Sequence, residues 1–126
     1  MSDKSHSIPS WLKIEHAQNH VLLTLEIAAL NESEGNSLKI CLEEQMASNS
    51  SMELAGVALD LAQVTLITSP AIGDLIFLHK RLTSQGLALV LLNPAPMLVQ
   101  TLEFLKLDQI LTVCRNPEEM RQALGG

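Results

Sequence analysis

Residues 57–86 read VALDLAQVTLITSPAIGDLIFLHKRLTSQG, and this stretch decides the fold. It opens with Val57 to Leu61, a short apolar run of the kind that forms a buried strand, and a second apolar run covers Val64 to Ile67. From Pro70 to Ser84 the apolar side chains recur at the helical period, and Gly86 stands where such a helix ends. The stretch therefore predicts a strand, a second extended run and a helix in direct succession.

Two hydroxyl residues, Thr68 and Ser69, separate the second apolar run from the helix. Serine is a preferred N-cap and proline is best tolerated at the first helical position, so we expect Ser69 as the N-cap and Pro70 as the first helical residue. The helix dipole and the unpaired N–H groups of the first turn favour negative charge at this end. Ser69 is therefore a candidate phosphate acceptor. Thr68 is a weaker candidate, because a hydroxyl at a strand end commonly bonds the backbone.

The rest of the chain alternates short strands with helices. Apolar patterns predict further strands over residues 13–17, 21–27, 87–92 and 110–113. Helical spacing predicts further helices over residues 33–47, along Leu98, Leu102 and Leu105, and from the N-cap Asn116 to about Leu124. The first two strands form a hairpin, after which residues 28–31 leave the sheet. The order β-β-α-β-α-β-α-β-α implies a mainly parallel sheet with one antiparallel strand.

The composition bounds the class of protein. A chain of 126 residues, 47% of them hydrophobic, is the size of one domain with one core. The net charge of -6 and the single Trp and two Phe argue against nucleic acid, which needs clustered cations and stacking rings. No apolar run approaches the ~20 residues of a membrane span, and residues 1–10 lack the apolar core of a secretory signal. We expect a cytoplasmic protein without direct membrane insertion, with a flexible lead over residues 1–10 and one domain over residues 11–126.

The chain carries no pattern of an enzyme or a metal site. Its histidines and its two cysteines have no metal-ligand spacing, and it has neither a glycine-rich nucleotide motif nor a G-x-S-x-G turn. Asp60 lies within an apolar strand, but the acidic pair and late lysine of a phosphorylated-aspartate receiver are missing, so we expect a structural role for it. The sequence indicates a non-enzymatic protein with no metal and no cofactor.

The order and spacing of four segments resemble the STAS domain of bacterial anti-sigma-factor antagonists and sulfate-transporter tails. In that family a V-x-L-D-L strand precedes a D-S-S-G-L-G loop, and an L-x-L-x-N strand and a G-L-D-x-x-F segment follow. The matching segments here are VALDL (57–61), ITSPAIG (67–73), LALVLLN (87–93) and KLDQIL (106–111). The resemblance covers roughly residues 12–124. It implies an α/β fold with a mixed, mostly parallel sheet of about four to five strands and helices packed mainly on one side.

The signature loop departs from the family pattern around its serine. Thr68 stands where the family has an acidic residue, Pro70 replaces the second serine, and Ala71 replaces the first glycine. Ser69 aligns with the serine that a partner kinase phosphorylates in the anti-sigma antagonists. In the early turn, residues 28–31 (AALN) replace the family's G-E-L-D, so another acidic position is neutral.

The resemblance implies a switch that acts through protein binding. The partner would be an anti-sigma-type serine kinase, and a PP2C-type phosphatase would reverse the phosphorylation of Ser69. A phosphate adds about -1.5 to -2 charges at a helix end that tolerates them, so partner binding would change while the fold persists. The expected partner-binding residues are Asn31, Thr68, Ser69, Pro70, Ala71, Ile72, Gly73 and Asp74.

Two other interpretations remain open. One is a STAS scaffold or subunit that is never phosphorylated, for example in a lipid-transport ATPase complex, in which Ser69 only caps its helix. The other is a small-ligand-binding domain with a pocket beside the second helix. On that helix, Leu75 and Phe77 lie roughly opposite each other, so Phe77 is either buried against a neighbouring helix or exposed in a docking patch.

Overall fold

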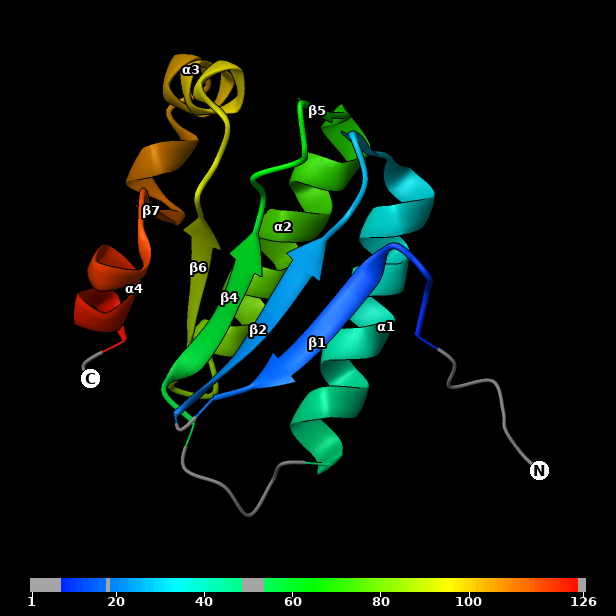
Figure 1. Cartoon of the computed structure of the whole chain (residues 1–126), viewed down its shortest axis with the longest axis vertical. Coiled ribbons are helices and arrows are strands. Elements are labelled where there is room, and N and C mark those ends of the chain that lie inside the picture. Colours follow the sequence, from blue (N-terminus) through cyan, green and yellow to red (C-terminus); the bar gives the residue numbers. More distant parts are fainter. Residues whose placement is uncertain (1–7, 18, 49–53, 125–126) are drawn as a thin grey trace.

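The computed structural model describes residues 8–17, 19–48 and 54–124 (Figure 1). Most of the predicted lead over residues 1–10 lies outside these ranges. The elements along the chain are β1 (Leu12–His16), β2 (His20–Leu25), β3 (Ala29–Leu30), α1 (Glu32–Ser48), β4 (Gly56–Asp60), β5 (Leu66–Ile67), α2 (Ser69–Thr83), β6 (Ala88–Leu92), α3 (Pro96–Phe104), the 3-10 helix η2 (Leu107–Gln109), β7 (Thr112–Cys114) and α4 (Pro117–Ala123).

Five strands form the main sheet in the order β1-β2-β4-β6-β7. β1 and β2 are the antiparallel hairpin, and each of the other neighbours is parallel, as the alternation of strands and helices predicts. The register places Leu23, Leu59 and Leu91 side by side across β2, β4 and β6. The sheet is therefore mixed and mostly parallel, which confirms the expected architecture.

Two apolar layers cover the sheet because successive side chains of a strand point to opposite faces. Leu59 and Leu91 face α1 and α2, which lie together behind the sheet in Figure 1 and enclose the larger core. Ala58 and Val90 face the other way and pack in a smaller cluster with Met120 of α4. β4 and β6 are buried on both faces, so their sequences read as unbroken apolar runs.

The stripe that α2 turns to the core consists of Ala71, Leu75, Leu78 and Leu82. These positions are three or four residues apart, which is the spacing that predicted this helix. Asn116 caps α4 as expected, since its side-chain Oδ1 accepts the Glu119 N–H at 2.9 Å. Leu105 departs from the expected stripe of α3, because the helix ends at Phe104 and Leu105 is 46% exposed.

Residues 28–31 leave the main sheet as predicted, but they do not become irregular. Ala29 and Leu30 form the two-residue strand β3, which pairs in parallel with β5 (Ala29 with Leu66, Leu30 with Ile67). The Ala28 carbonyl also accepts the N–H groups of Thr65 and Leu66 at 2.8 and 3.1 Å. This small ladder stands at the end of the main sheet, next to the first turn of α2 (Figure 1).

Candidate functional site

Partner binding was expected along residues 28–31 and 68–74, and the β3–β5 ladder brings these two segments together. They are far apart in the chain, yet the parallel pairing of Leu30 with Ile67 places residues 28–31 beside the strand that leads into residues 68–74. α1 begins directly after β3 and α2 directly after β5. We call this surface the rim; it consists of residues 28–31 and 66–74.

The start of α2 lies one residue earlier than predicted. Thr68 is the N-cap, with extended backbone angles (φ -77°, ψ 161°), while Ser69 is the first helical residue and Pro70 the second. The Thr68 side chain makes no capping hydrogen bond. The expectation that Ser69 caps the helix is therefore wrong. The reason is tertiary: Thr68 is fixed in extended geometry by its N–H, which donates to the Leu30 carbonyl at 3.0 Å.

Ser69 is exposed at the N-terminus of α2. Within residues 8–17, 19–48 and 54–124, its hydroxyl has no hydrogen-bond partner. α2 carries no acidic side chain in its first turn, so no fixed carboxylate competes for the dipole and the N–H groups there. Ser69 thus combines an accessible oxygen with a helix end that favours an anion.

Thr68 is held more tightly than Ser69. It is half-buried, and its Oγ1 donates to the Leu30 carbonyl at 3.4 Å while its own carbonyl accepts the Ile72 N–H at 2.9 Å. These bonds tie the start of α2 to the end of β3. A kinase would have to break the Oγ1 contact to reach this hydroxyl.

The other residues expected at the rim differ in accessibility. Asn31, Pro70 and Gly73 are exposed, and Ile72 is half-buried. Asn31 also begins α1: its carbonyl accepts the Gly35 N–H at 2.9 Å, and its N–H donates to Glu34 Oε1 at 3.2 Å. Ala71 is 0% exposed and belongs to the core stripe of α2, so it supports the rim from below and presents no surface to a partner.

Asp74 points toward α1 and not toward solvent. Its side chain is 15% exposed, and Oδ1 lies 2.9 Å from Nζ of Lys39. Lys39 also lies over the ring of Phe77, 5.2 Å from the ring centroid. Asp74 therefore joins the two helices, and Lys39 neutralises its charge close to the anion-favouring end of α2.

Leu66 is the rim residue that sequence reasoning missed. It is 56% exposed at the edge of β5, next to Thr68 and Ser69 in the chain. The run Val64 to Ile67 is apolar except for Thr65, although only its two ends, Val64 and Ile67, are buried. Phe77 is 49% exposed and Leu75 is 1% exposed, so Phe77 is not buried against a neighbouring helix. Nothing in the local pattern marks Leu66 as exposed.

The described ranges contain no cluster of three or more His, Cys, Asp or Glu side chains that could hold a metal ion. In the same ranges, no helix has both the length and the hydropathy to span a bilayer.

Comparison with known proteins agrees with this architecture. The STAS domain family matches residues 12–120, and the chain belongs to this family. A crystal structure of a candidate anti-sigma factor antagonist from Thermotoga maritima superposes with a TM-score of 0.75 at 18% identity, covering 93% of this chain and 97% of that one.

The anti-sigma factor antagonist SpoIIAA, solved in its unphosphorylated form, superposes with a TM-score of 0.65 at 14% identity, covering 91% of this chain and 98% of that chain. At these identities the two superpositions establish a shared fold. No curated protein sequence matches the chain significantly.

Proposed function

We propose that this protein is a non-enzymatic regulator of the anti-sigma-antagonist type. It binds a serine kinase of the anti-sigma class through the rim, and phosphorylation of Ser69 by that kinase releases it. A PP2C-type phosphatase resets the switch. The observation that carries the proposal is the Ser69 hydroxyl, which is exposed and without a hydrogen-bond partner in the described part of the chain, at the N-terminus of a 15-residue helix.

The rim suits a switch that changes binding and not folding. A phosphate on Ser69 would face the dipole and the N–H groups of the first turn of α2, so the folded state tolerates it. For a docked protein, the same group is a bulky dianion beside the exposed Leu66 and Pro70. An apolar or acidic partner surface that fits the unmodified rim then loses its fit.

The experiment needs the kinase that acts on this chain, for which the first candidates are small ATPase-fold kinases encoded beside it. Incubation with that kinase and ATP, followed by intact mass and peptide mapping, should show one phosphate on Ser69. Ser69→Asp should weaken kinase binding by at least about ten-fold, because it places a carboxylate in the interface. Ser69→Ala should bind the kinase and accept no phosphate.

Thr68→Val is the matched control, since it removes the neighbouring hydroxyl and keeps the shape of the side chain. Phosphorylation should continue in this variant. The phosphoswitch at Ser69 is wrong if peptide mapping of the unmodified sequence places the phosphate on Thr68. It is also wrong if Ser69→Ala and Ser69→Asp bind the partner equally well. Equal binding by the two Ser69 variants would favour the alternative of an unphosphorylated STAS scaffold, for example a subunit of a lipid-transport ATPase complex.

A further inference from the structure

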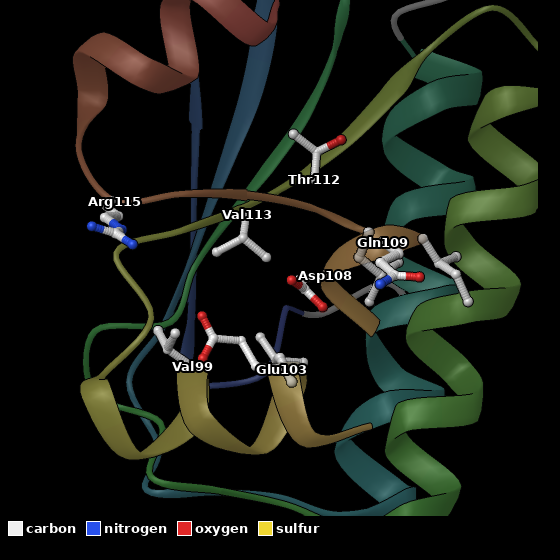
Figure 2. A pocket seen from close by; sticks show the side chains of 10 residues that line it. Val99, Glu103, Asp108, Gln109, Thr112, Val113 and Arg115 are labelled. Carbon is white, nitrogen blue, oxygen red and sulfur yellow. The ribbon is translucent and has the colours of Figure 1, made fainter. Parts of the chain in front are cut away.

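A groove of about 460 Å³ runs along β7, between that strand and the α3–η2 segment (Figure 2). It lies at the edge of the main sheet, because β7 is the last strand in the order β1-β2-β4-β6-β7. Its charged lining comes from Glu103, Asp108 and Arg115. Its apolar lining comes from Val99, Leu102, Ile110, Leu111 and Val113. The groove is separate from the rim, since none of its residues belongs to residues 28–31 or 66–74.

The main chain of β7 leaves one residue unpaired at this edge. Cys114 faces β6, because its carbonyl accepts the Asn93 N–H at 2.9 Å. Backbone groups of alternate residues point to opposite sides of a strand, so the N–H and C=O of Val113 point away from β6. Among the described residues neither group has a hydrogen-bond partner. The next outward N–H, that of Arg115, already donates to Glu119 Oε1 at 2.8 Å.

The charged side chains of the groove are also unpaired. Figure 2 shows the Glu103 carboxylate rising from α3 and the Asp108 carboxylate reaching in from η2, with Val113 between them. Arg115 lies at the far end of the groove. No ion pair or side-chain hydrogen bond engages Glu103, Asp108 or the Arg115 guanidinium within the described ranges. The groove thus offers two carboxylates beside an open pair of main-chain groups.

We propose that this groove binds an extended peptide segment of a partner protein, which adds as a strand to the open edge of β7 and places a Lys or Arg side chain between Glu103 and Asp108. Strand addition uses the two free groups of Val113, and the pockets beside the strand select its side chains. The two carboxylates favour a cationic side chain by charge complementarity. This occupant accounts for the main-chain and side-chain observations together.

A second copy of the chain fits the groove less well. Each copy carries a net charge of -6, and its own groove edge supplies one cation, Arg115, against two carboxylates. Two such edges facing each other would bring four carboxylates into one region. A basic peptide carries the opposite charge and meets no such repulsion.

The test uses the full ¹⁵N-labelled chain and capped nine-residue peptides of alternating Thr and Val, with Lys, Arg, Ala or Glu at the centre. The Lys and Arg peptides should shift the Val113 amide resonance and slow its hydrogen exchange at least about ten-fold, because the amide gains a partner. The Glu peptide should bind at least about five-fold more weakly. Glu103→Arg should abolish or invert this preference. Val113→Pro, which removes the free N–H donor and the valine side chain and also fixes φ at this position, should weaken every peptide.

Glu15→Arg is the charge-matched control on β1, at the opposite edge of the sheet, and it should change no affinity. The proposal fails if no peptide binds at 2 mM, about the weak limit for such an edge. It also fails if Lys and Glu peptides bind alike, or if free lysine reproduces the shifts of the Lys peptide. Protection of Val113 that rises with protein concentration alone would assign the edge to a second copy. Ser69→Asp should leave these affinities unchanged, so this proposal and the phosphoswitch fail separately.

Discussion

Nζ of Lys39 on α1 lies 2.9 Å from Oδ1 of Asp74 on α2, in a pair whose side chains are 29% and 15% exposed. Gly35 makes this pair possible, because a Cβ at that position would collide with the Asp74 carboxylate. α1 and α2 both begin at the rim, one after β3 and the other after β5. The pair therefore fixes the position of α2, whose first turn lies in the rim, relative to α1, which begins next to the rim.

Loss of the Asp74 carboxylate should destabilise the protein by about 1–2 kcal/mol, because Lys39 is left partly buried without its counter-charge. This is less than the cost for a fully buried pair, since both side chains retain some contact with water. Asp74→Asn and urea denaturation give the value. The double variant Lys39→Met/Asp74→Asn should recover part of the loss, because it removes the unpaired charge. If the double variant is as unstable as the sum of the two single variants, the pair is not coupled.

Two glycines offer a matched test of how tightly the helices are joined. Gly73→Ala should stabilise the protein by about 0.5–1 kcal/mol, because alanine has the higher helix propensity and its Cβ meets nothing within 4 Å. Gly35→Ala gains the same propensity, but its Cβ displaces Asp74 from Lys39, so we expect a net loss of about 1 kcal/mol or more. Thermal and urea unfolding of both variants measure the difference. Equal effects would mean that Asp74 moves aside without cost.

The sequence was sufficient to predict the strands and helices whose hydrophobic patterns are local. β4 and α2 were predictable because an unbroken apolar run and a stripe of period 3.6 need no knowledge of neighbours. The β3–β5 ladder was not, because two residues on each side carry no periodicity and their pairing is set by contacts between distant segments. The exposure of Leu66 follows from that same ladder, which is why the pattern of its run did not reveal it.

The first residue of α2 also could not be predicted from local sequence alone. Thr68 and Ser69 are both acceptable N-caps by residue type, so propensity alone does not separate them. The Leu30 carbonyl separates them, since it accepts both the N–H and the Oγ1 of Thr68 and holds that residue in extended geometry. The candidate site was thus predictable as a region, but the role of each hydroxyl depends on a tertiary contact.

Because Ser69 makes no capping bond, its removal should cost little. Ser69→Ala should change the free energy of unfolding by less than about 0.5 kcal/mol, the range of ordinary surface substitutions. Thr68→Ala should cost about 0.5–1.5 kcal/mol, because it removes the Oγ1 hydrogen bond to the Leu30 carbonyl, although the backbone N–H of residue 68 still donates to that carbonyl. Urea titrations of the two variants check the order. A loss at Ser69 larger than at Thr68 would show that Ser69 is the residue fastened to the fold.

The hairpin turn should make stability depend on pH between neutral and mildly acidic conditions. Burial lowers the pKa of His20 below its ordinary value of 6.5. The unfolded chain therefore binds the proton first as the pH falls, so His20 contributes a loss of stability from about pH 7 downward. Nδ1 of His20 lies 3.1 Å from Oδ1 of Asn19, and the side-chain amide of a glutamine at position 20 can make the same hydrogen bond. His20→Gln should flatten the decline of the unfolding midpoint from pH 7.5 to 5.5. Parallel profiles for the two proteins would mean that His20 does not titrate differently on folding.

The two thiols should be unreactive while the protein is folded. Cys41 and Cys114 are 7% and 3% exposed, and burial raises the pKa of each, with Glu44 and Glu119 adding to the effect. The thiolate is the form that attacks a disulfide reagent, so both low access and a raised pKa slow the reaction. Ellman's reagent at pH 8 should label neither residue of the native chain within minutes and both in urea.

The variants Cys41→Ala and Cys114→Ala then report each site alone. Because Cys114 is in β7 and Cys41 is in α1, faster labelling of Cys114 would show that the edge strand opens before the helix layer does. Rapid native labelling of Cys41 would contradict the buried packing of α1 against the sheet.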